Sequence, residues 1–305
     1  MSAISGTIMG LNISSSAKKR ARAAVLRLAA YLLIAYVAVG AFLYFRQSAL
    51  IYPAPKIWAN STPAKCGLQF EDVQIPVASN GHVHAWWIPA AQHSEKAVLV
   101  LHGNGYVIED MVGEEVTALH EIGANLLIID YRGYGLSTPI SPCEMTIVED
   151  ARAALLYLLQ KRYLLVRNVF VLGRSIGTGP ATKLVSETKS LGGLILESPL
   201  TSIDAISSRL WVSHIYPVSL LLNTHFDNLS KIRSIEAPLL VVSGTADTLT
   251  PTWMAKAIFA SARPPKKLYF VEQADHDDLV SMGGISLVAV LRNFVDNALL
   301  TRPSR

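Results

Sequence analysis

Six short apolar runs divide the chain between residues 97 and 272, and they limit its fold more than any other feature. The runs are AVLVL (97–101), NLLIID (125–130), VFVLG (169–173), GLILES (193–198), PLLVVSG (238–244) and KLYFVE (267–272). Runs this short and apolar are typical of strands buried on both faces. The segments between them have helical periodicity, most clearly CEMTIVEDARAALLYLLQ at 143–160. Alternating strands and helices predict an α/β fold with a mostly parallel sheet covered on both sides.

Two segments before these runs alternate apolar and polar residues. LQFEDVQIPV (68–77) and HVHAWWIPA (82–90) flank Ser79-Asn80-Gly81, which predicts an antiparallel hairpin at the start of the sheet. No internal repeat is visible, and about 240 residues suit one domain, which we place at 67–305.

A continuous apolar stretch stands near the N-terminus. LAAYLLIAYVAVGAFLYF (28–45) has no charge over 18 residues and as a helix would span roughly 27 Å, close to the thickness of a bilayer's hydrocarbon core. Five basic residues precede it in AKKRARAAVLR (17–27). A cleaved signal peptide is the alternative, with Ala38-Val39-Gly40 as its cleavage site. We favour an uncleaved signal anchor, because those residues lie inside the apolar stretch with no polar segment before them.

The anchor predicts both the topology and the domain organisation. By the positive-inside rule, a basic tail (1–22) is cytoplasmic, the anchor is 23–45, and a linker (46–66) leads to the domain across the membrane. That membrane would be the bacterial inner membrane, or an endomembrane in a eukaryote. Residues 1–46 hold six Lys and Arg and no acidic residue, whereas the rest holds 21 basic and 23 acidic residues. The net charge of +4 therefore reflects topology and gives no reason to expect nucleic-acid binding.

A serine lies between two glycines directly after the run at 169–173. In GRSIG, Gly173 and Gly177 stand two residues on either side of Ser175, and a helical stretch, ATKLVSETK (181–189), follows. A sharp strand-to-helix turn holds a nucleophile in a strained backbone conformation, and only glycine-sized neighbours fit around it. The pattern alone arises by chance in roughly one protein of this length in ten. Its place between a strand and a helix makes Ser175 the candidate nucleophile.

A serine nucleophile needs a base and an orienting acid, and the last two apolar runs are followed by both. Asp247 stands three residues after Gly244, and His276 lies in a loop before the final helical stretch. Serine, acid, histidine is the chain order of an α/β-hydrolase. His82 and His84 share a strand face, but no third ligand is evident, so we predict no metal site.

The turn after the first run has the composition needed near a reacting carbonyl group. It is His102-Gly103-Asn104-Gly105, whose glycines let the backbone approach a substrate closely. A tetrahedral intermediate needs backbone N–H donors, and we assign those of Asn104 and Ile176, with His102 and Gly103 forming the oxyanion turn. A phosphate-binding loop would require the pattern G-x-x-x-x-G-K, which the turn lacks. No cofactor is implied.

Several motifs together resemble a known superfamily. They are LHGNG, DYRGYGLS (130–137), GRSIGTGPA, ESPLTSI (197–203), FDNLSKI, GTADTLTP and ADHDDL. From about residue 67 to the C-terminus the chain resembles the α/β-hydrolases. More narrowly, it is similar to a membrane-anchored subgroup with bacterial single-pass hydrolases and eukaryotic protein-depalmitoylating esterases. The resemblance implies Ser175 as nucleophile, His276 as base and Asp247 as acid. It makes DYRGYG a structural turn, so Asp130 and Arg132 receive no chemical role.

One position departs from that resemblance. Relatives usually have Gly before the histidine, where this chain has Asp275, and Asp277 and Asp278 follow. If these carboxylates point towards His276, they favour its charged imidazolium form and weaken general-base catalysis in acid.

The two cysteines, Cys66 and Cys143, have no neighbours at metal-ligand spacing. In an exported domain they could pair, but the sequence does not show whether their Cα atoms come close enough. Two unpaired thiols are an equal alternative.

These patterns predict a membrane-anchored serine hydrolase that cleaves a carboxylic ester or thioester through an acyl-enzyme. An amidase or peptidase would use the same residues, and a catalytically silent binding or scaffolding protein could keep the same fold. The expected partners are the membrane and a small or lipid-like acyl ester or an acylated protein, with no nucleic acid.

A small apolar cap is expected at about 200–237. It contains SSRLWVSHIYPVSLLLNTHF (207–226), in which Pro217 interrupts any helix. Insertions at this point of α/β-hydrolases lie over the nucleophile, so the cap would line the mouth of the pocket or touch the bilayer and favour acyl chains. The alternative is that the cap's large apolar residues pack as a small helical layer onto the domain. These residues are Leu210, Trp211, Ile215 and Leu220 to Leu222.

Overall fold

The chain folds into two compact units, residues 1–46 and 47–305. The structure is a computed structural model that describes residues 15–55, 61–78 and 81–298. Helix α1 (Ser15–Ile51) begins in the first unit and ends in the second. The tail before Ser15 and the hairpin turn at Ser79-Asn80 lie outside the described residues.

Two helices in the described part of the chain are long and apolar enough to cross a membrane, and α1 is the more apolar of them. None of the residues in its most apolar window is buried. It extends beyond the predicted anchor at both ends, because Arg, Lys and Ala before the anchor and Gln-Ser-Ala-Leu after it are compatible with helix. The predicted linker (46–66) is therefore wrong in its first part, which is helical as far as Ile51.

The end of α1 is part of the second unit's packing. Tyr52 is almost fully buried, and its hydroxyl lies 3.3 Å from Thr224 Oγ1. The Gln47 side-chain amide donates to the carbonyl of Leu221 at 3.1 Å and accepts from the backbone N–H of Asn223 at 2.8 Å. Residues 47–52 therefore belong to the fold of the domain rather than to a linker.

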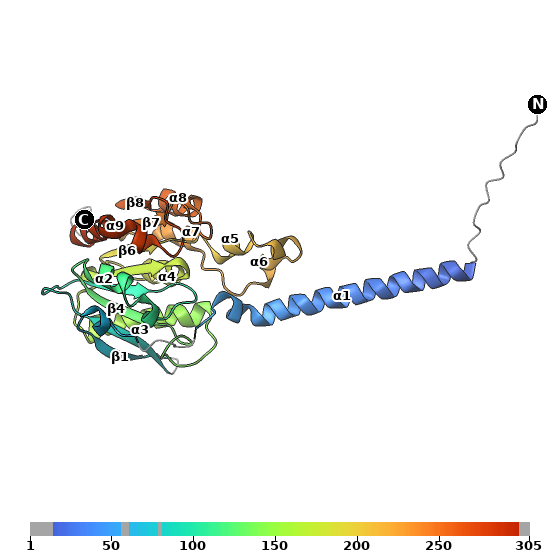
Figure 1. Cartoon of the computed structure of the whole chain (residues 1–305), viewed down its shortest axis with the longest axis horizontal. Helices are drawn as coiled ribbons and strands as arrows, with labels where there is room; N and C mark the ends of the chain where they lie inside the picture. The colour runs from blue at the N-terminus through green and yellow to red at the C-terminus, as the bar shows by residue number, and fades with distance from the viewer. Residues whose placement is uncertain (1–14, 56–60, 79–80, 299–305) are drawn as a thin grey trace, which may run out of the picture. The chain divides into compact units, whose positions relative to one another are not determined.

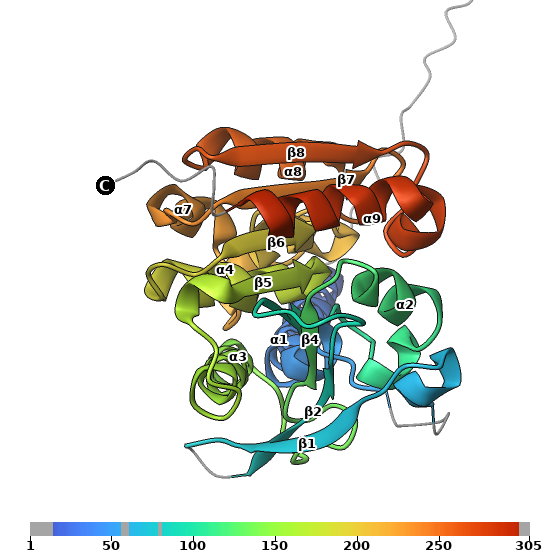
Figure 2. The same cartoon turned by 90° about the vertical axis from the view of Figure 1, so that its left-hand side faces the viewer.

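An eight-stranded sheet forms the centre of the second unit (Figures 1 and 2). Its spatial order is β1-β2-β4-β3-β5-β6-β7-β8. Strand β2 runs against both of its neighbours, and all other pairs are parallel, as the sequence predicted. The strands are β1 (Glu71–Pro76), β2 (His82–Ile88), β3 (Ala97–Leu101), β4 (Asn125–Asp130), β5 (Val169–Arg174), β6 (Gly193–Glu197), β7 (Leu239–Gly244) and β8 (Lys266–Val271).

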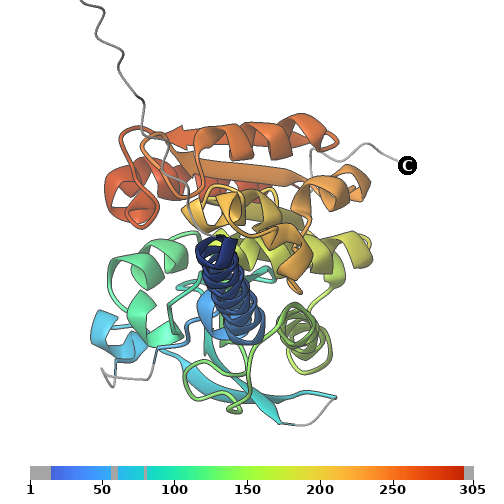
Figure 3. The same ribbon diagram turned by 90° about the vertical axis from the view of Figure 1, so that its right-hand side faces the viewer.

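Helices cover both faces of this sheet, which creates two hydrophobic cores (Figures 2 and 3). Helices α3, α4 and α8 pack on one face, and α2 and α9 pack on the other. Helix α9 is long and apolar enough to span a membrane, but its Leu287, Leu291 and Val295 are buried in the second core. The five helices are α2 (Glu114–His120), α3 (Glu144–Gln160), α4 (Thr178–Glu187), α8 (Thr252–Ser261) and α9 (Leu279–Asn297).

The cap consists of short elements between β6 and β7. Pro217 separates η5 from α6, as predicted. Of the two alternatives for the cap, a packed helical layer does not describe Leu210, Trp211, Ile215 and Leu220, because their side chains are exposed. The elements are α5 (Ile203–Ser207), η5 (Trp211–His214), α6 (Val218–Leu221), α7 (Asn228–Lys231) and η6 (Ile232–Ser234).

Four further single turns of 3₁₀ helix connect the main elements. They are η1 (Pro63–Cys66), η2 (Ile108–Met111), η3 (Val166–Asn168) and η4 (Ser175–Gly177). Cys66 ends η1 and Cys143 immediately precedes α3. Both are free thiols in the structure, which favours the unpaired alternative.

The loop after β4 has the structural role that the resemblance implied. The Asp130 carboxylate accepts the backbone N–H of Ile108 at 2.9 Å and lies 3.4 Å from the His84 ring. Arg132 forms an ion pair with Asp150 at 2.5 Å. Burial raises the pKa of Asp150 to about 6, although Arg132 opposes the shift. These buried polar contacts hold the loop against the sheet.

Candidate active site

Ser175 lies at a strained turn between β5 and α4. Its φ is +52°, a left-handed conformation that non-glycine residues rarely adopt. A Cβ on Gly173 would lie 2.7 Å from the Cβ of Ala181, and one on Gly177 would overlap the carbonyl oxygen of Leu101. The two glycines are therefore required for close packing around the turn, and the predicted strain at Ser175 is confirmed.

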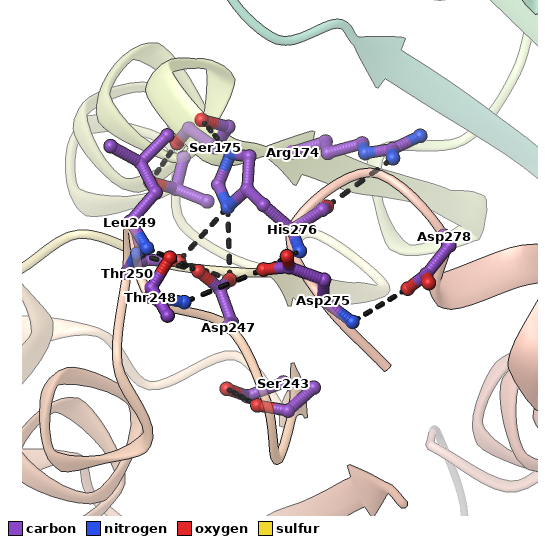
Figure 4. A network of polar contacts seen from close by, with 12 residues as sticks. Arg174, Ser175, Ser243, Asp247, Thr248, Leu249, Thr250, Asp275, His276 and Asp278 are labelled. Carbon is purple, nitrogen blue, oxygen red and sulfur yellow. Dashed lines mark hydrogen bonds and ion pairs between the residues drawn. The ribbon is translucent and has the colours of Figure 1, made fainter. Parts of the chain in front are cut away.

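The structure brings Ser175, His276 and Asp247 together from the ends of three different strands (Figure 4). His276 Nε2 lies 2.9 Å from Ser175 Oγ, and His276 Nδ1 lies 2.9 Å from Asp247 Oδ2. The carboxylate is fully buried, whereas the imidazole is 12% exposed. The carboxyl ends of β5, β7 and β8 thus place a hydroxyl, an imidazole and a carboxylate in one continuous hydrogen-bonded chain.

The surroundings of Asp247 determine which proton each group carries. Burial raises the pKa of Asp247, but hydrogen bonds from His276 and Thr250 outweigh burial, and the pKa lies below its ordinary value. The ionised carboxylate can only accept hydrogen bonds, so His276 Nδ1 carries the proton that it donates. His276 Nε2 is then left as the acceptor for the hydroxyl of Ser175.

Thr250 supports this arrangement, although it is not among the site residues predicted from the sequence. Its hydroxyl donates to Asp247 Oδ2 at 2.7 Å, and its backbone N–H donates to Asp247 Oδ1 at 2.7 Å. The backbone N–H of Leu249 donates to the same Oδ1 at 2.9 Å. Asp followed by Thr three residues later is a spacing at which side chain and backbone hydrogen-bond locally, and it could have identified Thr250.

The turn after β3 packs directly against Ser175. A Cβ on Gly103 would lie 3.4 Å from Ser175 Cβ, so Gly103 keeps the backbone close to the hydroxyl. His102 is buried against the rings of Tyr131 and Tyr134, and burial lowers its pKa. His102 is therefore a neutral packing residue of this turn. Asn104 lies in the same turn, and its side-chain oxygen is buried.

Arg174 connects the turn at Ser175 to two other loops, and no sequence pattern had indicated it. Its guanidinium forms an ion pair with Glu115 at 2.8 Å and lies 5.7 Å above the ring of Tyr106. It also donates to the backbone carbonyl of His276 at 3.5 Å. The neighbouring Glu197, paired with Arg174 in the sheet, is buried, and burial raises its pKa to about 7 while Arg174 opposes the shift.

Two acidic residues beside His276 accept hydrogen bonds from backbone N–H groups near it. Asp275 Oδ1 accepts the backbone N–H of His276 at 2.8 Å and that of Thr248 at 3.4 Å. Asp278 Oδ1 accepts the backbone N–H of Asp275 at 2.6 Å. Both carboxylates thus bind the backbone around the imidazole, a use that the sequence did not predict. Asp277 is exposed.

The cap is attached at both of its ends to the elements that carry the site. The Arg209 guanidinium donates to the carbonyls of Thr248 and Leu249 at 2.8 and 2.9 Å. At the other end, the Asn228 side-chain amide donates to Thr178 Oγ1 at 3.2 Å, at the start of α4. The segment between these attachments borders the loop that contains Asp247.

Comparison with known proteins identifies the class. The family model of the serine aminopeptidases (S33) matches residues 92–230. The uncharacterised protein Rv2307c of Mycobacterium tuberculosis is 30% identical over 270 residues, which cover 86% of this chain and 92% of that protein. The chain belongs to the α/β-hydrolase superfamily.

Two further similarities agree with this class. The human α/β-hydrolase domain-containing protein 17B is 27% identical over 227 residues, covering 73% of this chain and 74% of that protein. The esterase Pf2001 of Pyrococcus furiosus superposes with a TM-score of 0.67 at 21% identity, covering 81% of this chain and 99% of the esterase. The esterase comparison shows the fold.

Proposed function

We propose that this chain is a membrane-anchored serine hydrolase that cleaves a carboxylic ester or thioester through an acyl-enzyme. The observation that carries the proposal is the continuous hydrogen-bonded chain from Ser175 Oγ through His276 to Asp247. A hydroxyl in contact with an imidazole, which a buried carboxylate orients in turn, is the arrangement that activates serine for attack on a carbonyl carbon.

The proposed reaction has two halves. Ser175 Oγ attacks the carbonyl carbon while His276 Nε2 takes its proton, and the oxyanion accepts the backbone N–H groups of Asn104 and Ile176. The tetrahedral intermediate collapses to the acyl-enzyme, and His276 gives the proton to the leaving alcohol or thiol. Water, deprotonated by His276, then attacks the acyl carbon and releases the acid, which restores Ser175. Asp247 keeps the proton on Nδ1 and stabilises the imidazolium in both halves.

The proposed anchor is the apolar part of α1, with the N-terminus in the cytoplasm. Its support is the apolar stretch at 28–45 and the basic residues before it. A reporter fused after Arg305 should be active only on the non-cytoplasmic side, and the full-length chain should stay in membranes after carbonate washing. Release of a shortened soluble form would mean that the segment is a cleaved signal peptide.

The chemistry is tested with an active-site probe and a substrate panel. A fluorophosphonate should label the wild type but not Ser175→Ala, and the wild type should hydrolyse acyl esters or thioesters. Labelling without hydrolysis of either, but with cleavage of peptide or amide substrates, would make the chain an amidase or peptidase, the activity in the name of the matching family model. Absence of labelling in the wild type would contradict the proposed nucleophile and favour a binding or scaffolding role.

A further inference from the structure

Four large apolar side chains of the cap are exposed, and we call them the cap ridge: Leu210, Trp211, Ile215 and Leu220. Their exposed fractions are 52%, 74%, 50% and 82%. They lie within eleven consecutive residues, on the part of the chain that projects from the globular unit around α5 and α6 (Figure 1). Scattered exposed apolar residues are normal, but a short segment with four large ones is typical of a surface that contacts a partner or a membrane.

One end of the cap ridge is connected to the proposed anchor through Gln47. Gln47 binds the backbone at Leu221 and Asn223, immediately after the ridge. Phe45, the last residue of the apolar stretch, is only two residues before Gln47. Two residues of chain reach at most about 7 Å, so the end of the ridge stays close to the point where the chain leaves the hydrocarbon, whatever the direction of the helix.

The other end of the cap ridge is bound to the loop that follows Asp247. Arg209, which precedes Leu210, donates to the carbonyls of Thr248 and Leu249. These residues follow Asp247 directly, and Leu249 is itself 49% exposed. The ridge therefore runs from the membrane-proximal residue Gln47 to the edge of the proposed active site.

We infer that the cap ridge inserts into the boundary between headgroups and acyl chains of the bilayer that holds α1. The site would then take its acyl ester or thioester substrates from that surface. Trp211 suits this place because its ring is amphipathic, and the aliphatic residues supply apolar area for insertion. The inference rests on the proposed function and adds the substrate class, which is an acyl chain resident in the bilayer rather than a freely soluble ester.

Insertion is tested directly with an environment-sensitive dye in the full-length chain. The dye is attached to Leu220→Cys or, as the matched control, to Ile285→Cys on α9, after Cys66→Ser and Cys143→Ser have removed the native thiols. Ile285 is 87% exposed and belongs to α9, which packs on the other face of the sheet, away from α5 and α6 (Figure 1). Both proteins are reconstituted in phosphatidylcholine–phosphatidylglycerol vesicles, with and without brominated acyl chains.

The expected result is a blue-shifted emission at position 220 that brominated lipid quenches at least twofold more than the emission at position 285. Equal, weak quenching at both positions would overturn the inference. A blue shift at position 220 without quenching by lipid would also overturn it, because the ridge would then be covered by protein, such as a second copy.

The link to substrate is tested with the double variant Trp211→Ser, Leu220→Ser. Its kcat/KM on a long-chain acyl ester in vesicles should fall at least tenfold, while hydrolysis of a soluble acetyl ester stays within twofold of the wild type. Trp211→Phe should retain most of the vesicle activity, and Ile285→Ser should retain all of it. Equal loss on both substrates, or no loss on either, would overturn the proposed substrate class.

The same assays separate this inference from the proposed function. If Ser175→Ala abolishes both activities and the ridge variant affects neither, the hydrolase proposal stands and the ridge inference fails. If the wild type hydrolyses neither substrate, the hydrolase proposal fails, and the dye experiment still decides whether the ridge enters the bilayer.

Discussion

The turn at Ser175 and the cap arrange polar and apolar groups in opposite ways. Around the turn, Arg174 and Glu197 are buried and Gly177 has no space for a methyl group. In the cap, by contrast, Trp211 and Leu220 are mostly in contact with solvent. Stability alone favours neither arrangement, since buried charges cost free energy and exposed apolar side chains contribute little. The buried charged residues and the exposed apolar residues both lie beside the proposed active site.

The turn and the cap have different tasks in the proposed site. The turn holds the Ser175 hydroxyl of the proposed site in place, and its backbone strain persists because tight packing and the Arg174–Glu115 ion pair surround it. The four side chains of the cap ridge are half or more exposed, so their apolar character is better explained by what they meet outside the domain. We therefore expect changes at the turn to affect chemistry and folding together, and changes in the cap to leave folding almost intact.

The largest effect is expected for Ser175 in the turn and for His276, which is hydrogen-bonded to it. Ser175→Ala and His276→Ala should each lower kcat by about 10⁴-fold or more, and the double variant should be little worse, because the residues act as a unit. The measurement is turnover of a soluble acetyl ester by the full-length chain. His225→Ala, at an exposed position in the cap, is the control and should keep normal turnover. Losses that add in the double variant would mean that the two residues act independently.

A smaller but still large effect is expected for Gly177→Ala. The φ of Gly177 is −60°, so alanine causes no backbone strain, but its Cβ would meet the carbonyls of Leu101 and His102. Overpacking of this kind costs about 1–3 kcal/mol, and a displaced Ser175 should lower kcat about 100-fold. Thermal unfolding and kcat measure the two effects. Ser219→Ala in the cap is the control, and an unchanged kcat in Gly177→Ala would show that the turn tolerates a shift.

An intermediate effect on stability is expected from the buried carboxyl group of Glu197. Burial raises its pKa to about 7 from an ordinary value of 4.5, so the folded state retains a proton that the unfolded state releases between these pH values. Stability should therefore fall as pH rises from the ordinary pKa of 4.5 through 7 and level off about one pH unit higher, by up to about 3 kcal/mol. In Glu197→Gln this contribution should disappear. Denaturant unfolding at pH 5 and pH 7.5 measures the difference between the two proteins, and parallel pH profiles would refute it.

The smallest effect is expected for Leu220→Ser. Because its side chain is 82% exposed, the free energy of unfolding in detergent should stay within about 0.5 kcal/mol of the wild type. Phe226, at the end of the same segment, is buried against Gly179, and Phe226→Ala should cost about 3–5 kcal/mol. A large loss for Leu220→Ser would show that the cap is stabilised by its own apolar residues after all.

The sequence predicted the sheet well because its signal is local. A strand buried on both faces must be apolar along its whole length, and all six runs form strands within one residue at each end, although β8, at the edge of the sheet, is only partly buried. The helix after Ser175 was placed less accurately. It begins at Thr178 rather than Ala181. Thr-Gly-Pro is a poor helix-forming sequence, but it directly continues the 3₁₀ turn that ends at Gly177.

Contacts between distant residues explain what the sequence did not predict. Ser175, Asp247 and His276 were predicted because strand ends meet at one edge of a parallel sheet. Arg174 and Glu115 are 59 residues apart, and no periodicity links them. Distant contacts also explain why residues 47–51 were predicted as part of a linker. A polar residue such as Gln47 after an apolar stretch is expected to face solvent, and only the structure shows that it pairs with Leu221 and Asn223.

The seating of Gln47 and Tyr52 in the domain has a consequence for how such an enzyme could be released from a membrane. Shedding proteases cut exposed, flexible stalks, but here the helix passes directly from the proposed span at Phe45 into residues that are buried in the folded domain. Cleavage on the domain side of Gln47 would remove groups that the cap binds. We therefore expect no soluble, active form to arise by trimming at this junction, so the proposed activity would stay confined to the membrane that holds the proposed anchor.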